Sequence, residues 1–173
     1  MGRIIVTLLI IFILSSCTHT YYIVRHAEKA TQEANMSSDV PLTEQGKQRA
    51  EQVKEVLKNK KIALVYSTNT IRTKSTAQPV ADYFHLPIGI YGPRPDSAFI
   101  ALLKSKKKNT LIVGHSNTVD DIVNMLCGKK EVDSDLPDTE YNKLFIVKRK
   151  GKKFSFSEST IYPNARVSIT PRF

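Results

Sequence analysis

The chain is poor in cysteine, since its 173 residues include only Cys17 and Cys127. No disulfide framework is expected, so a hydrophobic core has to hold the fold together. Long hydrophobic runs are also missing. Residues 4–14 are apolar except for Thr7 and would span about 17 Å as a helix, well short of the ~30 Å hydrocarbon core of a bilayer. The length and the hydrophobic content of 41% indicate one globular domain.

Acidic residues are scarce, with 16 Asp and Glu against 26 Lys and Arg, which gives a net charge of +10. The lysines cluster in residues 58–61, 104–108 and 148–153. Such clusters either attract the chain to an anionic membrane surface or a phosphorylated substrate, or keep solvated loops soluble. Both interpretations stay open. Basic and aromatic residues do not interleave, so no nucleic-acid partner is predicted.

The N-terminus has the pattern of a targeting segment. Arg3 precedes the apolar run, which ends in Leu14-Ser15-Ser16-Cys17 and resembles a bacterial lipobox. This predicts a lipoprotein signal peptide over residues 1–16, a lipidated linker over 17–20 that includes His19, and a domain over 21–173. An ordinary signal peptide or an uncleaved anchor remains the alternative. The expected location is the bacterial cell envelope, with a lean towards the periplasmic face of the outer membrane.

Apolar runs alternate with segments of helical period along the rest of the chain. Strands are predicted at 21–24, 62–66, 88–91 and 110–113, and a hairpin at 144–147 and 154–157. Helices are predicted from Thr43 as N-cap, over 70–84 with a kink at Pro79, over 97–104 behind Asp96, and over 117–126 before Gly128. This alternation predicts an α/β fold, a three-layer α/β/α sandwich with a mostly parallel central sheet.

Two histidines and two arginines follow the apolar runs. Arg25 and His26 end the first run, His115 comes just after residues 110–113, and Arg72 follows the run that ends near residue 66. Ligands of open α/β sheets bind at the carboxyl ends of the strands, where these side chains would meet. A neutral imidazole can attack phosphorus, and arginine binds phosphate oxygens through a fixed fork. The sequence therefore predicts a phosphoryl site.

Four segments carry a family resemblance. Residues 24–28 (Val-Arg-His-Ala-Glu) resemble the Arg-His-Gly/Ala signature of the histidine phosphatase superfamily, which has the phosphoglycerate-mutase-like fold. Residues 42–50 look like its Leu-Thr-x-x-Gly helix start, residues 67–77 like its Ser-x-x-x-x-Arg-x-x-x-Thr-Ala segment, and residues 113–116 like its second histidine motif. In this order they cover nearly all of residues 21–173, which the resemblance makes a histidine phosphatase domain of the small phosphatase branch.

The resemblance implies a role for each site residue. His26 would be the nucleophile, Arg25, Arg72 and His115 would complete the phosphate pocket, and no metal or cofactor would be needed. Ser67 and Asn117 could also bind phosphate, although both are common turn and cap residues.

The donor of the leaving-group proton is the open position, because the chain lacks the glutamate-containing segment of the family's mutases. Asp96 is one candidate, but it could simply cap the next helix. Glu28 is a weaker candidate and could instead orient Arg25.

These residues predict a metal-independent phosphomonoesterase with a covalent phosphohistidine intermediate, anchored in the envelope through lipid on Cys17. Its substrate would be a phosphorylated small molecule or an envelope glycan. Two alternatives remain: a catalytically poor phosphate-binding lipoprotein, and a mutase that transfers the phosphoryl group to an acceptor other than water.

Overall fold

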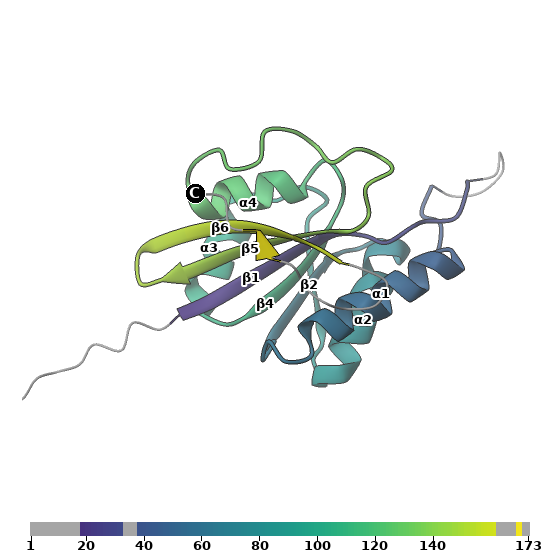
Figure 1. Cartoon of the computed structure of the whole chain (residues 1–173), viewed down its shortest axis with the longest axis horizontal. Helices are drawn as coiled ribbons and strands as arrows, with labels where there is room; N and C mark the ends of the chain where they lie inside the picture. The colour runs from purple at the N-terminus through teal and green to yellow at the C-terminus, as the bar shows by residue number, and fades with distance from the viewer. Residues whose placement is uncertain (1–17, 33–37, 162–168, 171–173) are drawn as a thin grey trace, which may run out of the picture.

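The central strand of the fold is β4 (Thr110–Gly114), in which all five residues are buried. A computed structural model describes residues 18–32, 38–161 and 169–170 of the chain. Within these residues a seven-stranded sheet runs in the order β3-β2-β4-β1-β5-β6-β7, with helices on both faces (Figure 1). The strands are β1 (Thr18–Arg25), β2 (Leu64–Thr68), β3 (Ile88–Tyr91), β4, β5 (Lys143–Lys150), β6 (Lys153–Thr160) and β7 (Ile169–Thr170). The helices are α1 (Glu44–Leu57), α2 (Ile71–Phe84), α3 (Ser97–Lys106) and α4 (Val119–Cys127).

The part of the sheet formed by β3, β2, β4 and β1 is parallel. Strands β3, β2, β4 and β1 all run in one direction, and Arg25 lies in register with Gly114. Strands β5, β6 and β7 are antiparallel to their neighbours and make the whole sheet mixed. Parallel strands present their carboxyl ends at one edge, so the loops after β1, β2 and β4 meet there.

Two apolar layers pack against the sheet, one on each face. Helices α1 and α2 cover one face, where Leu57, Val80 and Leu111 belong to one hydrophobic cluster. Helices α3 and α4 cover the other, where Leu103 and Ile122 belong to a cluster with neighbouring strand residues. Successive strand residues point to opposite faces, so a strand covered on both sides has to be apolar throughout. The predicted three-layer sandwich is confirmed.

The predicted helix caps are confirmed at three positions. The Thr43 side chain accepts a hydrogen bond from Gly46 N, and Asp96 Oδ1 accepts one of 2.7 Å from Phe99 N. Gly128 ends α4 with a φ of 70°, a left-handed conformation that glycine adopts without strain. Gly46 packs directly on the backbone of Glu28, where a Cβ atom would clash, so this glycine seats α1 against the loop after β1.

Strand β1 is longer than the sequence predicts. Residues 18–20, assigned to a linker, are part of β1, because they pair with β5 from Thr18 opposite Lys150 onward. His19 is therefore not in a tail: it is 4% exposed, and its Nε2 lies 3.0 Å from the hydroxyl of Tyr21. The predicted lipidation site, Cys17, lies outside the described residues. Among the described residues, no helix combines the length and apolar character needed to cross a membrane.

Candidate active site

A cavity of about 930 Å³ opens at the carboxyl ends of β1, β2 and β4. It brings together Arg25, His26, Arg72 and His115, which are separated by up to 90 positions in the sequence. The cavity is also lined by Lys29, Thr70, Gly92, Pro93, Arg94, Asp96, Ser116, Asn117, Thr118, Asp138 and Tyr141. The predicted meeting point of these strands is therefore a real concave site.

The imidazole of His26 is held in one tautomer. Its Nδ1 lies 2.8 Å from Ala27 O, and because a carbonyl only accepts, Nδ1 carries the proton and Nε2 keeps its lone pair. The residue is 4% exposed, and its backbone N donates to Gly114 O at 2.9 Å. Burial lowers the pKa of His26 to about 3, although the Ala27 hydrogen bond raises it, and the charge of Arg25 lowers it further. His26 is therefore a neutral, oriented nucleophile at neutral pH.

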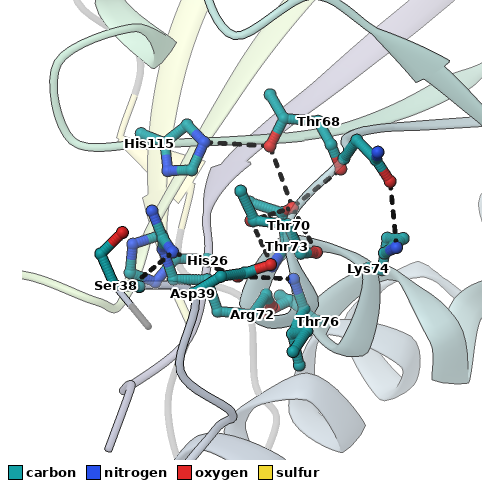
Figure 2. A network of polar contacts seen from close by, with 12 residues as sticks. His26, Ser38, Asp39, Thr68, Thr70, Arg72, Thr73, Lys74, Thr76 and His115 are labelled. Atoms are coloured by element: carbon teal, nitrogen blue, oxygen red, sulfur yellow. Dashed lines mark hydrogen bonds and ion pairs between the residues drawn. The ribbon is translucent and has the colours of Figure 1, made fainter. Parts of the chain in front are cut away.

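The second histidine lies edge-on to the first. The ring centroids of His115 and His26 are 5.5 Å apart, and His115 Nε2 lies 2.9 Å from Thr68 Oγ1 (Figure 2). The backbone N of His115 donates to Thr118 Oγ1, which fixes the turn into α4. Burial, followed by the charge of Arg72, lowers the pKa of His115 to about 4. A phosphate dianion in the cavity would raise that pKa again, because opposite charge favours the imidazolium.

Arg25 is clamped by the loop before β5. Its Nη1 donates to Pro137 O at 2.8 Å, its Nη2 donates to Asp138 Oδ1 at 3.2 Å, and its guanidinium lies 4.3 Å from the centroid of the Tyr141 ring. The side chain is nearly fully buried, yet its Nε has no hydrogen-bond partner among the described residues. A buried donor without a partner is costly, so a ligand oxygen in the cavity would stabilise this position.

Arg72 reaches the same cavity from the first turn of α2. Its Nη1 lies 3.4 Å from both Ser38 O and Asp39 Oδ1, and its Nε is a second buried donor that lacks a partner in the described part of the chain (Figure 2). Thr76 Oγ1 donates to Arg72 O and accepts from Ala27 N, which joins α2 to the turn that holds the nucleophile. Two guanidinium groups with a spare donor each make this an anion site.

Of the other three predicted site residues, two line the cavity and one does not. Asn117 and Asp96 both line the cavity and are exposed, and Asp96 also caps α3. Ser67 is fully buried, donates to Thr68 O at 2.9 Å and does not line the cavity. Its neighbour Thr68, which the sequence analysis did not single out, contacts His115 instead. Strand alternation allows only one of the two hydroxyls to face the site, but it does not say which.

Glu28 lies away from the reacting groups. Its carboxylate accepts three hydrogen bonds from Arg49, the shortest being 2.7 Å, and both side chains are largely buried. It therefore does not orient Arg25, as one of the two sequence interpretations supposed. Since its oxygens are committed to Arg49 and it does not line the cavity, Glu28 serves to fix α1 against the loop after β1.

The cavity is rich in positive charge. Lys29 and Arg94, which no sequence motif indicated, line it together with the two arginines described above, while Asp96 and Asp138 are its carboxylates. Among the described residues, no group of three or more His, Cys, Asp or Glu side chains could hold a metal ion. The donor set consists of nitrogen donors for an oxyanion rather than ligands for a cation.

Comparison with known proteins places the fold. Residues 21–91 match the model of the histidine phosphatase superfamily (branch 1), a segment that includes His26, Arg25 and Arg72. No curated protein matches the chain. Among solved structures, the protein histidine phosphatase SixA complexed with tungstate is 22% identical, with a TM-score of 0.65 over 83% of this chain and 97% of that one.

Two further structures share the architecture. Phosphoglycerate mutase from Bacillus anthracis is 15% identical, with a TM-score of 0.58 over 82% of this chain and 92% of its own. Mycobacterial glucosyl-3-phosphoglycerate phosphatase is 10% identical, with a TM-score of 0.60 over 89% and 99%. At such identities the likeness is one of fold, and that fold is phosphoglycerate-mutase-like.

Proposed function

We propose that this chain is an enzyme of the histidine phosphatase superfamily that hydrolyses phosphomonoesters without a metal, through a phosphohistidine at His26. The observation that carries the proposal is the state of His26: it is buried and neutral, with Nδ1 bonded to Ala27 O, in a cavity that Arg25 and Arg72 also line. A nucleophile and anion donors in one cavity are what phosphoryl transfer requires.

The reaction would take place in two displacements. His26 Nε2 attacks phosphorus, the bond between phosphorus and the ester oxygen breaks, and that oxygen leaves with a proton from a general acid. Water then attacks the phosphohistidine, the N–P bond breaks, and the proton of the water returns to the same group. Arg25, Arg72 and His115 would bind the non-bridging oxygens, over which the negative charge of the phosphoryl group is spread in both transition states.

Asp96 is the candidate general acid because it lies on the cavity wall. Its role as a helix cap can be separated from a role in catalysis by substitution. Asn caps a helix as well as Asp does but donates no proton to a leaving group. We therefore expect Asp96→Asn to lower kcat on an alkyl phosphate by about 10²-fold, and to leave hydrolysis of p-nitrophenyl phosphate almost unchanged, because nitrophenolate leaves without a proton. If Asp96→Asn and the wild type hydrolysed each of the two esters at equal rates, Asp96 would be only a helix cap.

The pH profile offers a second test. In the free enzyme the pKa of His26 lies near 3 and that of His115 near 4, so both imidazoles stay neutral down to mildly acidic pH. Protonation removes the lone pair, so kcat/KM should not fall through an imidazole titration between pH 7 and 5 and should fall only as the pH approaches 4. A clear loss of kcat/KM centred near pH 6.5, the value for an unperturbed histidine, would contradict the buried state of His26 if it remains after correction for the ionisation of the ester's own phosphate.

The activity itself is tested with p-nitrophenyl phosphate and the domain of residues 18–173, which contains every element of the described fold. EDTA should leave the activity unchanged. A folded domain that binds inorganic phosphate but neither hydrolyses esters nor forms a phosphohistidine would instead be a phosphate-binding lipoprotein. Transfer of the phosphoryl group to an added alcohol in preference to water would indicate a mutase.

The proposal places the enzyme in the bacterial cell envelope, attached through lipid on Cys17 at the periplasmic face of the outer membrane, with a phosphorylated small molecule or an envelope glycan as substrate. The lipobox-like residues 14–17 support it. In cells, Cys17→Ser should move the protein from the membrane fraction to the soluble fraction, as measured by fractionation after a high-salt wash. Thr18→Ser, which leaves the cysteine in place, should stay in the membrane fraction. Salt-resistant attachment of Cys17→Ser would contradict lipidation.

A further inference from the structure

The net charge of the protein is concentrated in residues 58–61, 104–108 and 148–153. Twelve of these fifteen residues are lysine or arginine, and none is acidic. The rest of the chain contains 14 basic and 16 acidic side chains, so the whole excess of +10 comes from these three segments. Charges that serve solubility alone are usually interspersed with charges of the opposite sign, and this distribution is different.

The fold brings the three segments to one end of the sheet. Residues 58–61 follow α1 and lead into β2, residues 104–108 include the end of α3 and lead into β4, and residues 148–153 include the end of β5, the turn and the start of β6. Lys150 pairs with Thr18, so this turn lies beside the start of β1, as Figure 1 shows. We call residues 58–61, 104–108 and 148–153 the basic end face. It lies opposite the candidate active site, which is at the carboxyl ends of the same strands.

Hydrogen bonds hold the basic end face together. Asn109 Nδ2 donates to Lys60 O at 2.7 Å, while Asn109 Oδ1 accepts from Thr20 N at 2.9 Å. Arg149 Nη1 donates to Lys104 O at 2.9 Å, which ties the β5–β6 turn to the end of α3. The three segments are thus fixed relative to one another and to the start of β1, so their charges form one surface.

The lysines of the basic end face are largely unpaired. Lys58 bonds to Glu55 at 2.7 Å. Among the described residues, no carboxylate lies within ion-pair distance of the exposed lysines in residues 106–108 and 148–153. Like charges packed on one surface repel each other and destabilise the fold, and a polyanionic partner would relieve that repulsion.

We propose that the basic end face docks onto an anionic phospholipid bilayer. A bilayer is wide enough to engage all three segments at once, whereas a single small anion would engage only one of them, and phospholipid phosphates attract lysines close to the surface. The strand that starts in this face, β1, begins at Thr18, directly after Cys17. A lipid on Cys17 and the lysines would therefore meet the same membrane, as a lipid chain and a polybasic patch do when they act together. The inference rests on charge and geometry and does not require the proposed phosphatase activity.

Vesicle binding of the unlipidated domain, residues 18–173, tests the inference without the anchor. The vesicles contain phosphatidylcholine alone or with phosphatidylglycerol. Lys108→Gln with Lys152→Gln removes two charges from the basic end face, and Lys47→Gln with Lys74→Gln removes two from the opposite end of the molecule. Both variants have the same net charge. Each lysine at an anionic surface contributes about fivefold to partitioning, so the first variant should bind about 25-fold more weakly to phosphatidylglycerol vesicles.

The expected result is binding to the anionic vesicles alone, with the control variant within about twofold of the wild type, and unchanged hydrolysis of a soluble ester by both variants. An equal loss of vesicle binding in the two variants would show that binding depends on the net charge of the protein and not on the basic end face, and would overturn the proposal. So would the absence of vesicle binding, or binding only to a soluble anionic polysaccharide such as heparin. Because hydrolysis of the soluble ester is measured separately, failure of the docking proposal and failure of the phosphatase proposal are distinguishable.

Discussion

Replacement of His26 by alanine should abolish turnover. The variant loses the atom that forms the bond to phosphorus, and no other side chain of the cavity takes its place, because His115 Nε2 is bonded to Thr68. Loss of a nucleophile costs on the order of 10⁴-fold or more in kcat. The measurement is the hydrolysis rate of p-nitrophenyl phosphate at saturating ester, with the unfolding temperature recorded for both proteins.

Two controls separate chemistry from folding in this experiment. His85→Asn changes an exposed histidine with a left-handed φ of 54° at the end of α2, a conformation that asparagine tolerates, and should keep full activity. Free imidazole should partly restore turnover to His26→Ala, because it can occupy the space of the missing ring. The wild type should also yield an acid-labile, base-stable phosphoryl adduct that His26→Ala lacks. A folded His26→Ala domain with wild-type turnover would disprove the mechanism.

Arg72→Ala should lower kcat/KM by about 10²- to 10³-fold, the usual cost of one donor to a developing oxyanion. The arginine lines the cavity, and its Nε has no partner within the described residues, so a phosphate there would gain a guanidinium partner. Arg72→Lys should recover part of the loss, because a lysine supplies the charge without the fork. Inorganic phosphate should inhibit Arg72→Ala far more weakly than the wild type.

The matched control is Lys74→Ala, two positions along the same helix. It removes the same charge, but Lys74 Nζ bonds to Asn69 Oδ1 and does not line the cavity. Its kcat/KM should stay within about twofold of the wild-type value, since surface charges far from a site act weakly. A similar loss in Lys74→Ala and Arg72→Ala would mean that the general positive field, and not a phosphate contact, explains the effect.

Local features of the fold could be predicted from the sequence. Thr43 and Asp96 cap their helices through hydrogen bonds to backbone atoms three residues away, and Gly128 ends α4 through its own backbone freedom. The buried strand β4 could be recognised because residues 111–113 are apolar at every position. These features depend on a few neighbouring residues, so the sequence alone indicates them.

Features that depend on distant pairing could not be predicted in the same way. His19 is in β1 because the strand pairs with β5, about 130 positions away. Glu28 is engaged by Arg49 through a contact between two elements, which no local pattern specifies. The hydroxyl that contacts His115 belongs to Thr68 and not to Ser67, because the register of β2 against β4 decides which side chain faces the cavity.

The length of β1 sets the height of the active site above any membrane at the basic end face. Eight extended residues, Thr18–Arg25, separate the first described residue from the arginine beside the nucleophile, and at about 3.3 Å per residue they span roughly 25 Å. In a molecule docked and anchored at the basic end face, the active-site cavity would lie away from the membrane leaflet that holds the molecule. Lipid headgroups of that leaflet could not reach the cavity. The phosphate of the substrate would have to arrive through the surrounding water, or on a polymer long enough to extend to the cavity.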